Sequence, residues 1–211
     1  MYKFIMTLIL ALCGVAATAG PVTVAALGDS LTQGYGLPEG DGFVPQLQRW
    51  LGDHGADAVL INAGVSGDTT AGGAARVAWT LSPEVKAMIV ALGGNDMLRG
   101  LDPAVTRANL ETILTTADQA GVKVLLIGMQ APGNYGPDYK AEFDAIYPDL
   151  AAEHGALYAA SFFEGLQEIS SDPAALQPFM QADGIHPNAE GVTRIVAALG
   201  PKVLELVRAA Q

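Results

Sequence analysis

Ser30 occupies a loop in which a serine hydroxyl could act as a nucleophile. It follows Gly28 and Asp29 directly after residues 22–27, a short apolar run that is typical of a β-strand. A strand that ends at glycine and small polar residues would present the hydroxyl at the carboxyl edge of a sheet, where open α/β folds bind their ligands. Because a serine hydroxyl is a weak nucleophile, this chemistry requires a base beside it in the fold.

The three histidines of the chain differ in their sequence surroundings. His54 and His154 each precede a glycine at the end of an expected helix, where a histidine can bond the last carbonyls and complement the helix dipole. We therefore assign a structural role to both. His186 instead lies in residues 183–188, Asp-Gly-Ile-His-Pro-Asn, which form an expected loop before a helix. This surrounding makes His186 the predicted base.

Asp183 is the predicted partner of that base. It lies three residues before His186, so a turn can bring its carboxylate onto one ring nitrogen and leave the other nitrogen for Ser30. The alternative is that Asp183 only closes an Asx-turn with Gly184. The combination with an exposed Gly-Asp-Ser loop favours a catalytic triad of Ser30, Asp183 and His186.

Acyl transfer also needs donors for the negative oxygen of a tetrahedral intermediate. The candidates are the backbone amides of Ser30 and Gly64 and the side-chain amide of Asn95. Gly64 lacks a Cβ, which allows its amide to approach a ligand closely. Ordinary turn chemistry is the alternative for Gly64 and Asn95. Because all three candidates follow successive expected strands, they should reach the same edge of the sheet.

Asp29 and Asp96 flank these candidates and raise the question of a metal site. The sequence places no histidine pair or carboxylate cluster beside them, and serine-based acyl transfer needs no metal. We interpret both as hydrogen-bond acceptors that shape their loops. No metal or cofactor is expected.

Apolar and small residues near the candidate site suggest a shallow groove for an acyl chain. The alternative is that most of them belong to the core. The residues expected to line the groove are Leu31, Met97, Ala131 and Ile185, with Leu98 and Leu101 nearby.

Strands and helices are expected to alternate along the chain. Such alternation predicts a parallel sheet with right-handed crossovers and helices on both faces, a three-layer α/β/α sandwich. Two prolines should interrupt helices, Pro148 by a kink or split and Pro201 together with Gly200 near the end of the chain. The expected strands are residues 22–27, 58–62, 88–92, 122–129 and 156–159, and the second is an apolar run that indicates burial on both faces.

Length and composition indicate one domain behind an export signal. The chain has 211 residues, and residues 20–211 suit a single domain with a sizeable core. Residues 1–19 resemble a secretory signal peptide, with Lys3 as the sole charge, an apolar run over residues 4–17 and small residues before Gly20. The alternative, an uncleaved membrane anchor, is disfavoured because the run is short for a bilayer span.

The single cysteine lies inside this N-terminal segment. Cys13 follows Leu12, where a lipid-attachment cysteine would need a small residue, so a lipoprotein is not expected. The mature chain would then contain no cysteine, and its stability must come from the core. We expect no stable membrane anchor after cleavage.

The chain is acidic, with 22 aspartates and glutamates against 11 lysines and arginines and a formal net charge of −11. This charge disfavours nucleic acids and anionic membrane surfaces as partners. The expected partner is a small-molecule substrate.

Four sequence blocks resemble the motifs of the SGNH, or GDSL, hydrolase family: residues 28–31, Gly64, residues 93–96 and residues 183–188. The stretches 66–69, 93–100 and 134–148 are similar, more narrowly, to the periplasmic thioesterase I, arylesterase and lysophospholipase type. The Gly-x-Ser-x-Gly elbow of α/β-hydrolases is absent, since Thr32 replaces its second glycine.

The resemblance implies a flavodoxin-like parallel sheet of about five strands. It also implies Ser30, Asp183 and His186 as triad, Ser30, Gly64 and Asn95 as oxyanion donors, no metal or cofactor, and a periplasmic or secreted location. The implied activity is hydrolysis of carboxylic esters and acyl thioesters through an acyl-enzyme, with aryl esters, acyl-CoA and lysophospholipids as substrates. A carbohydrate or cell-wall O-acetylesterase is the alternative enzyme, and a non-catalytic exported binding module is the alternative from another class.

Overall fold

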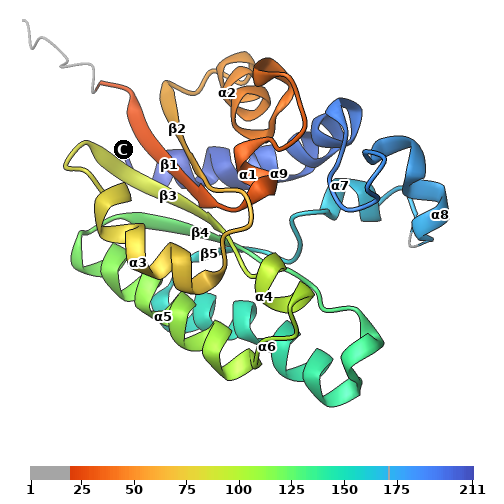
Figure 1. The fold of residues 1–211 in the computed structure, drawn as a ribbon. Helices are drawn as coiled ribbons and strands as arrows, with labels where there is room; N and C mark the ends of the chain where they lie inside the picture. The colour runs from red at the N-terminus through yellow and green to blue at the C-terminus, as the bar shows by residue number, and fades with distance from the viewer. Residues whose placement is uncertain (1–19, 171) are drawn as a thin grey trace, which may run out of the picture.

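Five parallel strands form one sheet in the order β2-β1-β3-β4-β5 (Figure 1). The computed structural model describes residues 20–170 and 172–211, so the expected signal peptide of residues 1–19 lies outside the described residues. The expected parallel sheet of about five strands is confirmed. Its strands are β1 (Val22–Gly28), β2 (Ala58–Gly64), β3 (Val85–Ala91), β4 (Lys123–Ile127) and β5 (Leu157–Ala159).

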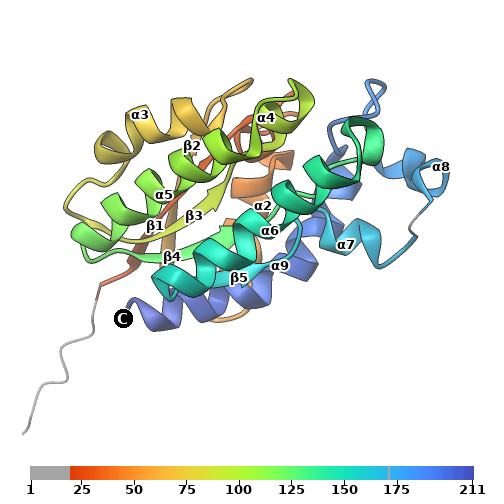
Figure 2. The same ribbon diagram turned by 90° about the horizontal axis from the view of Figure 1, so that it is seen from below.

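Helices cover both faces of the sheet, which confirms the three-layer sandwich (Figures 1 and 2). The chain leaves β1 for β2 on one side and later places β3 on the other side, so right-handed crossovers put the connecting helices on opposite faces. One layer contains α2 (Phe43–Asp53) and α9 (Ala189–Ala209), and the other contains α3 (Thr70–Thr80), α5 (Pro103–Gln119) and α6 (Pro137–His154).

Shorter helical turns lie in the loops between these elements. They are α1 (Ser30–Gln33), α4 (Gly94–Leu98), α7 (Glu164–Gln167), α8 (Pro173–Leu176), η1 (Glu39–Asp41), η2 (Gly133–Tyr135) and η3 (Gln177–Phe179). Within the described ranges, no helix combines the length and the apolar character needed to cross a bilayer.

The second strand differs from expectation because it lies at the edge of the sheet. Its residues Val59 and Ile61 are 47% and 37% exposed, so the predicted burial on both faces is wrong. Most helix contacts of β2 are with α1 and α2, and α3 reaches the strand through Arg76 at Ala63, near its end, so Val59 and Ile61 stay open to solvent. An apolar run therefore indicated a strand here but not its degree of burial.

The outer edge of β2 is covered in part by a side chain. Gln48 of α2 donates from Nε2 to the Ala58 carbonyl at 2.9 Å and accepts from the Leu60 amide at Oε1 at 2.8 Å. The amide group of Gln48 thus satisfies two backbone groups that an edge strand would otherwise leave without partners.

Neither Pro148 nor Pro201 splits its helix. Both α6 and α9 are continuous, with Pro148 and Pro201 inside them. Each proline lies on the exposed side of its helix, where water can bond the carbonyl that loses its partner. Gly200, which precedes Pro201, allows the ring of Trp50 to pack closely, since a Cβ there would lie 2.7 Å from ring atoms.

Candidate active site

Ser30 begins α1 directly after the turn that follows β1. Asp29 caps this helix, since its Oδ1 accepts the Leu31 amide at 3.0 Å. The side chain of Thr32 occupies the space that a Cβ on Gly28 would need, so the turn requires glycine at that position. The chain adds β2 on one side of β1 and then β3 on the other side, so the strand order reverses at β1. Ser30 therefore lies where open α/β sheets form a ligand crevice.

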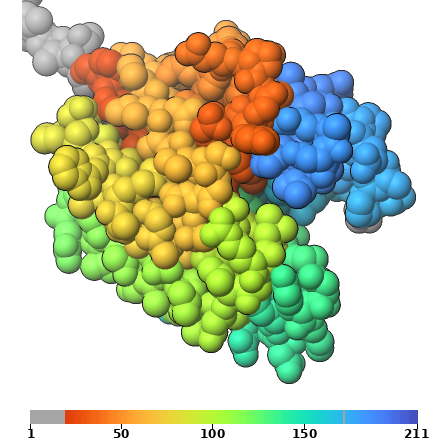
Figure 3. Space-filling view, in the orientation of Figure 1, coloured from red at the N-terminus to blue at the C-terminus, as the bar shows by residue number. Residues whose placement is uncertain are grey.

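The structure brings Ser30, His186 and Asp183 together. His186 Nε2 lies 2.9 Å from Ser30 Oγ, although the two residues are 156 positions apart. His186 Nδ1 lies 2.6 Å from Asp183 Oδ2. In the space-filling view, segments from the first, middle and last parts of the chain adjoin on this face (Figure 3). These distances are those of a nucleophile, a base and an orienting carboxylate.

The loop before α9 orients the carboxylate of Asp183 in two ways at once. Oδ2 contacts the imidazole, while Oδ1 accepts the backbone amides of Ile185 at 2.9 Å and His186 at 3.0 Å. The Asx-turn and the triad contact therefore occur together. Hydrogen bonds from the His186 amide, the His186 ring and the Ile185 amide lower the pKa of Asp183 to about 2, which keeps the carboxylate ionised.

A second set of contacts fixes this loop against the loop after α1. Gln181 donates from Nε2 to the carbonyls of Tyr35 at 2.8 Å and Pro187 at 3.0 Å. The Tyr35 ring packs against the His186 ring, with centroids 4.8 Å apart. Asn188 caps α9 as its side chain also bonds the carbonyl of Pro178 at 2.7 Å. Neither Tyr35 nor Gln181 is predicted from the sequence, because their residue types carry no signal of catalysis.

Asn95 and Asp29 meet beside Ser30. The side-chain amide of Asn95 donates to the carbonyl of Asp68 at 2.9 Å and lies 3.4 Å from Asp29 Oδ2. Asp29 is only 2% exposed, and burial raises its pKa to about 6, although the Leu31 amide opposes the shift. A carboxyl group in this setting changes charge near neutral pH.

Asp96 links α4 to the start of α3. It is fully buried and accepts the amide of Thr70 at 2.9 Å and the hydroxyl of Thr70 at 2.5 Å. The expectation that Asp29 and Asp96 act as loop-shaping hydrogen-bond acceptors is confirmed.

Two glycines near the end of β2 could donate to an oxyanion: Gly64 ends the strand, and Gly67 lies in the loop that follows it. The amide of Gly64 already donates to Asn62 Oδ1 at 3.0 Å. The amides of Gly67 and Ser30 have no acceptor among the described residues. Gly67 has a left-handed backbone, with φ of 80°, and immediately precedes Asp68, whose carbonyl holds Asn95. Gly64 is the donor predicted from the sequence, although residues 66–69 also resemble a stretch of the family.

A family model described as the GDSL-like Lipase/Acylhydrolase family matches residues 26–194. The chain belongs to this family. It is a serine hydrolase that acts on ester bonds, and the SGNH or GDSL resemblance found in the sequence is confirmed.

Curated relatives and solved structures agree with this assignment. Esterase TesA of Pseudomonas aeruginosa is 40% identical over 90% of this chain and 91% of its own length. Thioesterase 1/protease 1/lysophospholipase L1 of Escherichia coli K12 is 35% identical over 88% of this chain and 85% of its own. The crystal structure of AlinE4, an SGNH-hydrolase family esterase, matches with a TM-score of 0.72 and 41% identity over 90% of this chain and 98% of that chain.

The residues expected to line an acyl groove in this hydrolase occupy different settings. Leu31 and Met97 are half-buried and Ile185 is exposed, all at the carboxyl edge of the sheet. Ala131 is 2% exposed, and its amide donates to Asp144 at 2.8 Å. Ala131 therefore presents little surface to a ligand in this structure.

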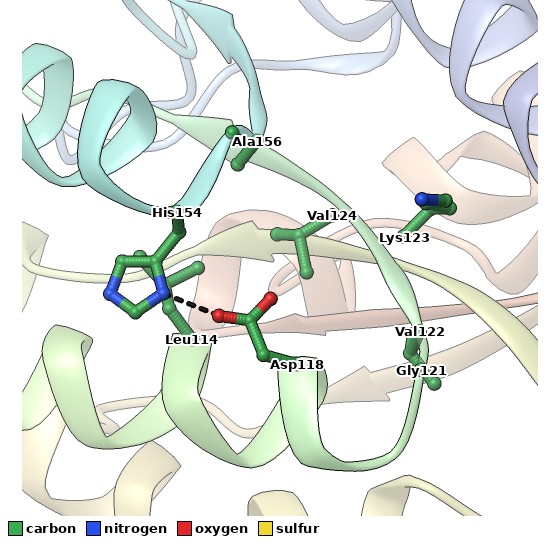
Figure 4. A pocket seen from close by; sticks show the side chains of 9 residues that line it. Leu114, Asp118, Gly121, Val122, Lys123, Val124, His154 and Ala156 are labelled. Carbon is green, nitrogen blue, oxygen red and sulfur yellow. Dashed lines mark hydrogen bonds and ion pairs between the residues drawn. The ribbon is translucent and has the colours of Figure 1, made fainter.

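The other two histidines of the hydrolase lie away from Ser30. His54 ends α2 with Nδ1 2.7 Å from the Trp50 carbonyl, as expected of a capping residue, and stacks on the Trp50 ring. His154 instead lies between two carboxylates of α5. Its Nδ1 is 2.6 Å from Asp118 (Figure 4), and its Nε2 is 3.1 Å from Glu111. The structural role expected of His154 stands, but its partners are carboxylates of α5 rather than carbonyls of its own helix, because α5 brings stronger acceptors within reach.

The described part of the hydrolase contains no group of three or more histidine, cysteine, aspartate or glutamate side chains arranged to hold a metal ion.

Proposed function

We propose that this hydrolase cleaves carboxylic esters and acyl thioesters with Ser30 as nucleophile, His186 as general base and acid, and Asp183 as the orienting carboxylate. The observation that carries the proposal is the 2.9 Å contact between His186 Nε2 and Ser30 Oγ, with Asp183 at 2.6 Å on the opposite ring nitrogen. A histidine held in this way can accept the hydroxyl proton as the oxygen attacks.

In the first step, Ser30 Oγ bonds to the substrate carbonyl carbon as its proton passes to His186 Nε2. The carbonyl oxygen becomes negative and needs donors that are already in place. We assign this role to the amides of Ser30 and Gly67, which have no acceptor among the described residues, and to the side chain of Asn95, whose long contact with Asp29 Oδ2, at 3.4 Å, gives way to the oxyanion. Gly67 replaces Gly64 in this proposal because the Gly64 amide is bound to Asn62.

In the second step, the bond between the carbonyl carbon and the alcohol or thiol breaks, and His186 returns the proton to the leaving group. Water then attacks the acyl-enzyme, with His186 again as base, and releases the acid and Ser30. Asp183 stays ionised throughout and stabilises the imidazolium that forms twice in the cycle.

Exposed apolar side chains in the loops at the carboxyl edge of the sheet, where Ser30 also lies, favour substrates with an acyl chain. They come from separate loops at the carboxyl edge, so they offer apolar surface to a substrate's acyl chain on more than one side of the site. Two of the relatives are named as an esterase and as a thioesterase and lysophospholipase, which agrees with esters, thioesters and lysophospholipids as substrates. The exposed residues are Tyr35, Val65, Leu98, Tyr135 and Ile185.

A carbohydrate O-acetylesterase would use the same triad but would have no need of this apolar surface. A series of p-nitrophenyl esters and acyl-CoA of increasing chain length separates the two activities. We expect turnover of medium-chain esters and acyl-CoA. Turnover of acetate esters alone would overturn the proposal and favour the O-acetylesterase.

We also propose that residues 1–19 direct export and are removed, so that the mature enzyme is a single domain of residues 20–211 in the periplasm or outside the cell. Mass spectrometry of the enzyme recovered from its native compartment tests this. A mature N-terminus at Gly20 is expected, whereas an intact Lys3 would contradict cleavage.

Labelling with a fluorophosphonate tests the site itself. The probe should label Ser30 in the wild-type enzyme and give no adduct in Ser30→Ala, whereas equal labelling of the two would overturn the assignment. A crystal structure of the adduct then tests the oxyanion donors. The phosphonyl oxygen should lie within about 3 Å of the amides of Ser30 and Gly67. A phosphonyl oxygen bound to the Gly64 amide instead would assign the oxyanion role to Gly64.

A further inference from the structure

Arg76 of α3 contacts three segments that converge on Ser30. Its Nε lies 2.8 Å from Asp68 Oδ2, its Nη1 donates to the Ala63 carbonyl at 2.7 Å, and its Nη2 donates to the Gly28 carbonyl at 2.9 Å. All three nitrogens of one guanidinium are therefore engaged, each with a different stretch of chain.

Each of these partners stands next to a part of the proposed site. Gly28 is the last residue of β1, two positions before Ser30. Ala63 is close to the end of the neighbouring strand β2. Asp68 follows Gly67 directly, and its carbonyl accepts the side chain of Asn95 at 2.9 Å. Arg76 thus connects the strand that precedes the nucleophile with the loop that carries the Gly67 amide and holds the Asn95 side chain.

The chemistry of these contacts requires an arginine. A planar guanidinium offers donors in fixed and divergent directions, whereas an ammonium is a single point of charge that cannot reach all three acceptors. The side chains of Arg76 and Asp68 are 23% and 13% exposed, so solvent screens this pair less than a fully exposed one. By contrast, Arg107 and Glu153 form an ion pair at the surface, between α5 and α6.

We propose that Arg76 is a positioning residue for the oxyanion site of this hydrolase, holding the Gly67 amide and the Asn95 side chain at a fixed place relative to Ser30 Oγ. The proposal rests on the proposed acyl-transfer function. Arg76 does not reach the substrate in this scheme and acts through Asp68 and the two strand ends. Because the oxyanion exists only in the transition state, misplacing its donors should lower kcat more than it changes KM.

The first test compares Arg76→Lys with the matched control Arg107→Lys. Active sites are counted by fluorophosphonate titration, so that kcat is expressed per reactive Ser30 and unfolded protein does not contribute. We expect Arg76→Lys to lower kcat by about 10- to 100-fold with KM changed by less than about threefold, since small misplacements of catalytic groups have effects of this size. Arg107→Lys should match the wild type.

A kcat per titrated site within about twofold of the wild type would overturn the proposal, as would a change confined to KM. If Arg76→Lys gives no titratable Ser30, Asp68→Asn is tested under the same criteria. This variant removes the ion pair but leaves the two carbonyl contacts of Arg76 in place, so a smaller fall in kcat is expected.

Chemical rescue provides a readout that a purely structural role would not move. Added guanidinium ion should raise the kcat of folded Arg76→Ala and leave Arg107→Ala unchanged. An equal response of the two variants would count against the proposal. Ser30→Ala separates the two levels of inference: if it keeps esterase activity, the proposed function fails, whereas an inactive Ser30→Ala beside a fully active Arg76→Lys removes only the role of Arg76.

Discussion

At each end of the parallel strands, a histidine is bound through Nδ1 to an aspartate at 2.6 Å. At the carboxyl edge this pair is His186 with Asp183, and at the opposite edge it is His154 with Asp118. The two pairs differ in what the second nitrogen meets. For His186 it is the hydroxyl of Ser30, whereas for His154 it is a second carboxylate, that of Glu111.

The third group decides what such a pair can do. Burial alone would lower the pKa of His154, but hydrogen bonds to Asp118 and Glu111 raise it above the ordinary value and favour the protonated form, which cannot act as a base. A cavity of about 150 Å³ opens beside His154 (Figure 4), yet its lining contains no serine, threonine or cysteine. A histidine–aspartate contact and an adjoining cavity therefore do not suffice to indicate catalysis.

Exchanging the two histidines for glutamine gives the largest expected contrast. His186→Gln should lower kcat for p-nitrophenyl esters by about 10⁴- to 10⁶-fold, because Ser30 loses its base. His154→Gln should leave kcat within about twofold of the wild type. Comparable losses in the two variants would show that the amino-terminal edge also takes part in the reaction.

The two aspartates should separate almost as far. Asp183→Asn is expected to lower kcat by about 10⁴-fold, because the amide no longer stabilises the imidazolium or fixes its tautomer. Asp118→Asn removes an equally short contact and should have no effect on kcat. Both variants are measured with the same ester, and an active Asp183→Asn would contradict the role proposed for Asp183.

The buried carboxylate of Asp29, next to Ser30, should lower the stability of the folded protein when it is ionised. Its pKa of about 6, raised by burial from 3.8, means that the folded state holds a proton more tightly than the unfolded chain. Stability is therefore lost as pH rises from about 4 to 6, and Asp29→Asn should be more stable than the wild type by up to ~3 kcal/mol at about pH 7.5. Urea unfolding measures the difference, which should vanish below about pH 4. A variant less stable at every pH would contradict this account.

His154 should show the opposite sign. Its folded pKa lies above the unfolded value, so its contribution is complete below pH 6.5 and is lost as pH rises through the folded pKa. His154→Gln should cost about 1 kcal/mol near pH 6 and little near pH 9. Unfolding curves at the two pH values test the sign, and a cost that grows with pH would rule out a charged His154.

The positions of Ser30, Asp183 and His186 could be predicted because local chemistry fixes each of them. Ser30 follows a strand and a glycine, and His186 lies between a nearby aspartate and a proline. Their meeting required only that the carboxyl ends of parallel strands share one edge.

Other features depended on contacts that a sequence does not display. The amide of Gly64 is occupied because Asn62 turns its side chain back, which favours Gly67 as the donor. Pro201 leaves α9 intact because it faces solvent, and β2 is exposed because it is the outermost strand. The three acceptors of Arg76 lie 8, 13 and 48 positions from it, so no local pattern announces them.

The side chain of Gln48 has a consequence for how molecules of this enzyme meet one another. A second polypeptide that tried to extend the sheet at β2 would have to compete for the Ala58 carbonyl and the Leu60 amide, both already taken. These two hydrogen bonds therefore disfavour edge-to-edge association of two sheets at β2. They do so without a charged residue and without any contribution from the catalytic end of the molecule.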